Sequence, residues 1–91
     1  MLSGPNEVFV AGNLKFKLVR SQKNLLGFAV GKKFGGAVER NKFKRRCRSF
    51  FVNFFQNKPY VYLVVFPLKP LVEIKDVRTD FLKLRGFLSG V

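Results

Sequence analysis

The chain has 91 residues, enough for one small domain with a single core, and carries a formal net charge of +13. That charge points to a nucleic acid or an anionic membrane surface, while 47% hydrophobic residues, twelve of them Phe, exclude a disordered basic tail. The lack of histidine excludes a histidine general base and an ordinary zinc site, and the single Cys47 excludes an intrachain disulfide, as in a protein of the reducing cytosol.

Hydrophobic periodicity divides the chain into short elements. From Leu14 to Val19 apolar and basic residues alternate, which is typical of a half-buried strand whose second face is basic. Tyr60 to Phe66 is a β-branched and aromatic run that suits one buried strand. In chain order we expect a loose start over 1–13, strands over 14–19 and 25–30, a helix over about 37–56, a strand over 60–66 and a helix over 74–88.

Each predicted helix has one apolar face. At about 100° per residue, the face of the first helix holds Phe43, Cys47, Phe50, Phe51 and Phe54. The face of the second helix holds Val77, Phe81, Leu84 and Leu88. We interpret these phenylalanines as core rather than base-stacking residues, and Cys47 as a small buried hydrophobe. With no repeat and no linker, the pattern predicts one α+β domain over 1–91, a mixed sheet packed by helices.

Nothing in the sequence suggests a membrane protein. The longest apolar run, Tyr60 to Leu68, is too short to span a bilayer and contains Pro67. The N-terminus lacks the basic region and apolar stretch of a secretory signal. We therefore expect a cytoplasmic protein without a membrane partner.

The most charged part of the chain is the segment 32–48, which holds eight of the eighteen basic residues against one acid, Glu39. Arg40, Lys44 and Arg48 recur every four residues and so lie along one helix flank. Mutual repulsion makes such a row costly unless solvent or a polyanion neutralises it. A solvated face is the alternative, but so many cations beside an aromatic core face favour a phosphate backbone, and the partner we infer is RNA.

Other kinds of site are poorly supported. Gly35-Gly36 is compatible with a chain reversal at positive φ or with close approach of a phosphate to a helix N-terminus, and the spacing does not match a P-loop. A nuclease with a two-metal site would need clustered carboxylates. The five acids are scattered and form no motif: Glu7, Glu39, Glu73, Asp76 and Asp80. We expect no catalytic side chain and no small-molecule substrate.

The segment GKKFGGAVERNKFKRRCRSFF resembles the signature of the bacterial ribonuclease P protein subunit, approximately S-K-K-x-G-N-A-V-x-R-N-R-x-K-R-x-x-R. The matching positions, all in register, are Lys32, Lys33, Gly35, Ala37, Val38, Arg40, Asn41, Lys44, Arg45 and Arg48. Gly31, Gly36 and Lys42 depart from the usual Ser, Asn and Arg, and Lys42 keeps the charge without the planar fork of arginine. The segments LKFKLV, LLGFAVGKK and VYLVVFPLKP resemble the family's strands more weakly.

The resemblance implies an α/β sandwich with a left-handed βαβ crossover, as in the RNase P protein and ribosomal protein S5 domain 2-like fold. It implies a protein that binds a catalytic RNA, RNase P RNA, and the 5′ leader of precursor tRNA. The RNA, with Mg²⁺ held mainly by the RNA, hydrolyses the phosphodiester at the mature 5′ end. The implied RNA-binding residues are Lys32, Lys33, Arg40, Asn41, Lys42, Lys44, Arg45 and Arg48. The candidate leader contacts are Phe9, Phe16, Lys15 and Lys17.

The family normally opens with a basic segment and a helix whose aromatic residues line the leader cleft. This chain has only NEVFVAG at that place, which we interpret as the end of a truncated N-terminal helix. The alternative function is a ribosomal or other structural RNA-binding protein without an enzymatic role.

Overall fold

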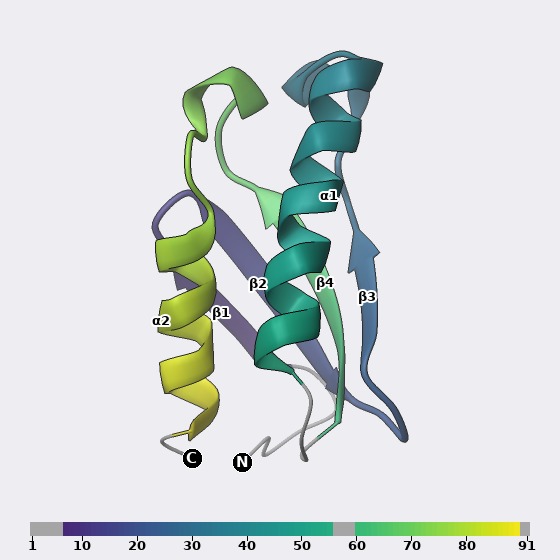
Figure 1. Ribbon diagram of the computed structural model, residues 1–91, viewed down its shortest axis with the longest axis vertical. Helices are drawn as coiled ribbons and strands as arrows, with labels where there is room; N and C mark the ends of the chain where they lie inside the picture. Colours follow the sequence, from purple (N-terminus) through teal and green to yellow (C-terminus); the bar gives the residue numbers. More distant parts are fainter. Residues whose placement is uncertain (1–6, 56–59, 90–91) are drawn as a thin grey trace.

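The computed structural model describes residues 7–55 and 60–89, and its strands form one mixed four-stranded sheet (Figure 1). The strands are β1 (Glu7–Ala11), β2 (Leu14–Arg20), β3 (Leu25–Phe28) and β4 (Val61–Pro67), in the spatial order β1-β2-β4-β3. β2 pairs antiparallel with β1 and with β4, whereas β3 runs parallel to β4. The three predicted strands are confirmed, with bounds shifted by one or two residues.

β1 was not expected. Glu7–Ala11 pairs with β2 along its whole length, from Glu7 opposite Leu18 to Ala11 opposite Leu14. The two-residue connection holds Gly12 at φ +59°, a left-handed conformation that suits a tight hairpin turn. The interpretation of this segment as a loose start or a helix end is therefore wrong. Its side chains follow the two-residue period of a strand, because pairing with β2 imposes it.

Both helices cover the same face of the sheet, which makes a two-layer sandwich (Figure 1). α1 (Ala37–Phe54) packs on β3 and α2 (Arg78–Ser89) packs on β1, and the two helices also contact each other. The short turns η1 (Lys32–Phe34) and η2 (Leu71–Glu73) precede them. α2 begins four residues later than the predicted Ile74, where Asp76 Oδ1 accepts a hydrogen bond of 2.8 Å from the backbone N–H of Arg78. Among the described residues, no helix has the length and apolar character needed to cross a membrane.

The connection from β3 through α1 to β4 is left-handed, as the resemblance implied. In Figure 1 both strands run upward, α1 lies in front of them, and β4 lies to the left of β3. A right-handed crossover would place the second strand on the right. Asn24 closes this unit by donating from its side-chain amide to the Phe55 carbonyl at the end of α1. Its Oδ1 accepts a hydrogen bond of 3.0 Å from the Val61 N–H at the start of β4.

The core lies between the helices and the sheet. Most of its fully buried side chains come from β2, β4 and α2, and they include Leu14, Phe16, Leu18, Leu63, Val65, Phe81 and Leu84. α1 adds Phe43, Cys47 and Phe51, which confirms its predicted apolar face. Phe50 and Phe54 are only half-buried, because they lie at the edge of that face, where α2 meets α1. The Phe50 ring centre is 6.0 Å from that of Phe81, and the Arg85 guanidinium lies 5.3 Å over the Phe54 ring.

Candidate nucleic-acid interface

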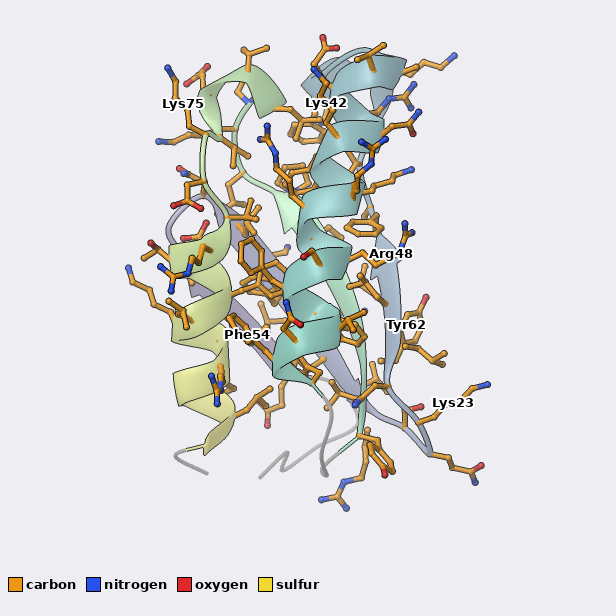
Figure 2. The ribbon with its side chains drawn as sticks, viewed as in Figure 1. Lys23, Lys42, Arg48, Phe54, Tyr62 and Lys75 are labelled. Atoms are coloured by element: carbon orange, nitrogen blue, oxygen red, sulfur yellow. The ribbon has the colours of Figure 1, made fainter. Side chains whose placement is uncertain are left out.

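The solvent-facing side of α1 is cationic (Figure 2). A first row, formed by Arg40, Lys44 and Arg48, follows one flank of the helix. Arg48 is exposed, whereas Arg40 and Lys44 are half-buried. The Arg40 Nε donates to the Gly36 carbonyl at 3.4 Å, so this side chain also supports the first turn of the helix.

Outside this row, α1 presents further polar and charged side chains to solvent. They are Asn41, Lys42, Arg45 and Arg46, all of them exposed. Their placement follows from the same periodicity that turns Phe43, Cys47 and Phe51 toward the core, because these four positions lie on the other sides of the helix. The helix therefore carries six cations, four of them exposed and two half-buried, outside a narrow buried apolar strip, an arrangement suited to a phosphate backbone.

The connection into α1 continues the basic surface. Lys32 and Lys33 lie on η1, and both are exposed, with the Lys33 ammonium 5.2 Å from the Phe34 ring centre. Gly35 (φ 166°) and Gly36 (φ −72°) both have extended backbones, and neither adopts the left-handed conformation that the chain-reversal interpretation requires, so that interpretation is wrong. Gly35 instead permits close packing, because an added Cβ would lie 3.3 Å from Leu71 Cδ1 and 3.3 Å from Glu39 Cβ. The glycine lets η2 approach the start of α1.

The second cationic surface is the face of the sheet opposite α1 and α2, which no helix of the described residues covers, here called the open sheet face. Lys15 and Lys17 of β2 lie on it, opposite Phe66 and Val64 of β4. The Lys15 ammonium is 4.9 Å from the centre of the Phe66 ring, within cation–π range. Tyr62, 41% exposed, extends the same face toward β3. Two lysines on β2 lie beside a strand that carries two aromatic rings, and an unpaired nucleotide strand can bind such a surface by charge and by stacking.

Two predicted leader contacts, Phe9 and Phe16, lie on the other face. Phe16 is fully buried, with its ring edge-on to Phe81 at 5.1 Å, so its assignment as a leader contact is wrong. Phe9 is half-buried and stacks on Phe87 of α2 at 4.6 Å, which directs its ring toward the helices. Strand alternation explains both placements, since residues 9 and 16 are register partners on the covered face.

Sequence reasoning missed three residues of these surfaces. Phe66 and Tyr62 were taken as part of a fully buried strand, yet β4 alternates between buried and more exposed positions. Every second residue of VYLVVFP faces away from the helices. The sequence did not reveal this alternation, because the residues on both faces of the strand are apolar or aromatic. Arg46 was left out because it falls at a variable position of the signature, although it is exposed on the flank of α1 opposite the first row.

The buried ionisable groups do not form a reactive site. Burial raises the pKa of the Cys47 thiol to about 12, with Asp80 acting in the same direction and Arg46 against it. A thiol of this kind stays protonated and is a poor nucleophile. Burial also raises the pKa of the Asp80 carboxyl, against the opposing effects of the Asn13 N–H and Lys83. Within residues 7–55 and 60–89 no three His, Cys, Asp or Glu side chains gather into a group that could hold a metal ion.

Known proteins match both the sequence and this geometry. Residues 6–85 match the family model described as Ribonuclease P. The chain belongs to the ribonuclease P protein family. A ribonuclease P protein component from Phytoplasma australiense is 32% identical over 86 residues, covering 86% of this chain and 75% of that protein.

Solved structures of ribonuclease P proteins share the fold. The RNase P protein from Thermotoga maritima in complex with 1-(4-fluorophenyl)-2-thiourea superposes with a TM-score of 0.66 at 30% identity, covering 93% of this chain and 81% of that one. The Staphylococcus aureus RNase P protein superposes with a TM-score of 0.59 at 22% identity, covering 94% and 77%. Family membership makes this chain a protein component of ribonuclease P, an endoribonuclease of tRNA processing, with an RNase P RNA as its implied partner.

Proposed function

We propose that this protein binds RNase P RNA through η1 and α1 and holds the 5′ leader of precursor tRNA on the open sheet face. The RNA, with Mg²⁺ bound to it, hydrolyses the phosphodiester at the mature 5′ end. The protein supplies cations and positions the leader, and no protein side chain takes part in the chemistry. The complex would act in the cytoplasm.

The observation that carries the first part is the distribution of charge on α1. Its six cations lie outside a narrow buried strip, and Lys32 and Lys33 extend the surface at its N-terminal end. Arginine can grip a phosphate with two parallel hydrogen bonds, which favours ordered contacts over diffuse attraction. The signature residues Arg40, Asn41, Arg45 and Arg48 belong to this surface.

The second part is supported by the open sheet face. Lys15 and Lys17 lie there beside Phe66 and Tyr62, while α1 occupies the opposite side of the sheet. One protein could therefore engage the catalytic RNA on one side and an unpaired leader on the other. Of the four candidate leader contacts, the proposal retains the two lysines.

The experiment is cleavage of precursor tRNA at low Mg²⁺ by a bacterial RNase P RNA with and without the protein. We expect the protein to increase cleavage by the RNA. The protein alone, rigorously freed of RNA, should not cleave precursor tRNA. Arg45→Ala should weaken assembly with the RNA by about tenfold or more, the loss of one charge-assisted contact. Lys23→Ala, an exposed cation in the β2–β3 turn, is the matched control.

Lys17→Ala separates the two surfaces. It should leave assembly with the RNA intact and weaken binding of precursor tRNA relative to mature tRNA, which has no leader. Unchanged RNA affinity in a folded Arg45→Ala variant would contradict the assignment of RNA binding to α1. RNA binding without any gain in cleavage would favour a structural RNA-binding protein.

A further inference from the structure

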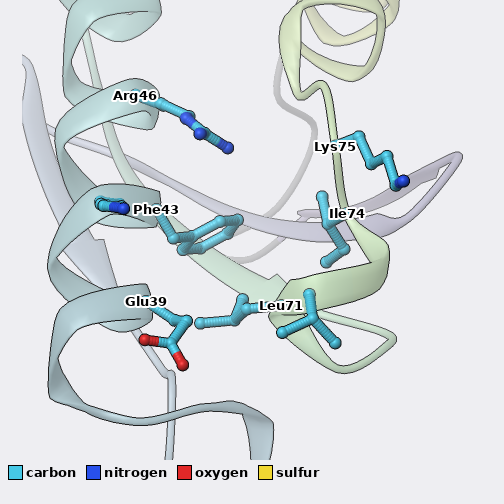
Figure 3. A pocket seen from close by; sticks show the side chains of 8 residues that line it. Glu39, Phe43, Arg46, Leu71, Ile74 and Lys75 are labelled. Atoms are coloured by element: carbon cyan, nitrogen blue, oxygen red, sulfur yellow. The ribbon is translucent and has the colours of Figure 1, made fainter.

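A groove separates α1 from η2 and the residues that follow it (Figure 3). Its volume is about 360 Å³, within the roughly 300–1,000 Å³ typical of small-ligand pockets. On α1 it is lined by residues at positions 39, 42, 43 and 46, so it opens on the flank opposite Arg40, Lys44 and Arg48. The first basic row and this groove are therefore separate surfaces of one helix.

The floor of the groove is apolar and firmly packed. Phe43, Leu71 and Ile74 form it, and only 4%, 6% and 3% of their surfaces are exposed. Figure 3 shows the Phe43 ring directed from α1 toward Leu71 and Ile74 on the opposite wall. The close approach of η2 to Gly35 holds this wall near the helix. Val72 completes the apolar lining and is 68% exposed, so it is the side chain that a flat apolar ligand face would cover.

The rim of the groove is cationic. Lys42 and Arg46 come from α1 and Lys75 comes from the segment after η2, and all are exposed. In Figure 3, Arg46 reaches across the groove from α1, whereas the Lys75 ammonium extends from the opposite wall away from α1, and the Glu39 carboxylate lies farther along the helix. Three cations around one carboxylate give the rim a net positive charge that favours an anionic ligand.

We propose that this groove holds one unpaired nucleotide of the RNA partner. The base would lie on the apolar floor, and its flanking phosphates would contact Lys42, Arg46 and Lys75. Glu39 is the acceptor for an amino or imino N–H on the edge of the base. A nucleotide has this combination of an apolar face, a polar edge and charged flanks, and proteins recognise unpaired RNA bases through such contacts. The inference rests on the proposed function insofar as the partner is RNA.

The first test compares ligands that differ only in the base. Adenosine, guanosine, cytidine and uridine 5′-monophosphates and ribose 5-phosphate are titrated separately into the ¹⁵N-labelled protein. We expect at least one nucleotide to shift the amide signals of residues 39–46 and 71–75 at concentrations where ribose 5-phosphate does not. Equal shifts with ribose 5-phosphate, or no shifts at these residues, would overturn the proposal.

The second test uses the complete protein with RNase P RNA. Lys75→Ala should weaken RNA affinity by about tenfold, the loss of one charge-assisted contact, while Lys23→Ala has a much smaller effect. Equal effects of these two variants, with a clear loss in Arg45→Ala, would refute the nucleotide site and leave the proposed function standing. If no variant, not even Arg45→Ala, lost RNA affinity, the proposed function itself would be refuted. Preservation of the Lys75→Ala fold is checked from its amide spectrum.

Discussion

Gly12 and Asp80 join the β1–β2 turn to the start of α2. The Asn13 N–H donates to Asp80 Oδ2 at 3.3 Å, and Gly12 adopts a φ of +59° directly beside the same carboxylate. A Cβ built on Gly12 would lie 2.1 Å from Asp80 Oδ1. This contact links residues nearly seventy positions apart in the sequence, and so holds the edge of the sheet against the second helix.

Gly12→Ala should destabilise the protein. The left-handed backbone alone costs a non-glycine residue about 1–2 kcal/mol, and the Asp80 side chain must also move. Gly86→Ala is the control, because Gly86 lies in α2 and, apart from its chain neighbours and the backbone of its own helix, no atom of the described residues lies within 4 Å of the added Cβ. It should stabilise the helix by about 0.5–1 kcal/mol. Urea unfolding of both variants measures the difference, and a Gly12→Ala variant as stable as the parent would contradict the geometry of the turn.

The Asp80 carboxyl should make stability depend on pH. Burial raises its pKa in the folded state, so the folded protein binds the proton more tightly than the unfolded chain does. This contribution to the free energy of unfolding is fully present below the ordinary pKa of 3.8 and is lost as pH rises through the folded-state pKa.

Asp80→Asn isolates this effect, since the amide oxygen can still accept from Asn13. Unfolding in urea at a series of pH values should show a shallower decline above pH 3.8 in the variant than in the parent. Identical slopes in the two proteins would mean that the carboxyl titrates alike in the folded and unfolded states.

Among the elements, α1 was the most predictable from the sequence. Its start at Ala37, its buried Phe43, Cys47 and Phe51 and its exposed cations all follow from a local period of 3.6 residues. The period could not predict how deeply Phe50 and Phe54 are buried. Their exposure depends on the position of α2, which lies more than twenty residues farther along the chain.

The sheet was less predictable because its pairing is non-local. β1 has only five residues, and its flanking glycines concealed a strand that forms by pairing with β2. The alternation in LKFKLV correctly predicted that Lys15 and Lys17 lie on the other face of the strand from Phe16. The family resemblance then grouped all three as leader contacts, against that alternation. The groove beside η2 could not be predicted from the sequence, because the residues that line it are about thirty positions apart in the chain.

The packing between α1 and α2 predicts unequal roles for their phenylalanines. Phe81 is fully buried between Phe16 and Phe50, so Phe81→Ala should cost about 3–5 kcal/mol. Phe54 is half-buried at the edge, and Phe54→Ala should cost about half as much. Chemical denaturation gives both values. Equal losses would mean that Phe54 is as deeply packed as Phe81.

At the scale of the whole molecule, the net charge of +13 should make the proposed RNA binding sensitive to salt. If about five to eight phosphates are neutralised, the logarithm of the affinity should fall against the logarithm of salt concentration with a slope of roughly −4 to −7. Arg45→Ala should reduce the magnitude of this slope by about one. Titrations of RNase P RNA over a range of salt concentrations measure it. A slope near zero would exclude the cations of α1 as the main contact.

The two-layer arrangement also sets a spacing. The helices and the sheet stack along the shortest axis of the molecule, whose extent is 21 Å (Figure 1). The Debye length at physiological salt is about 8 Å, so anions held on α1 and on the open sheet face would be separated by more than two screening lengths. Each surface would then release its counterions independently, and the salt slopes for the catalytic RNA and for the leader should simply add. The protein would thus hold two polyanions far enough apart that they repel each other only weakly while both are bound to it.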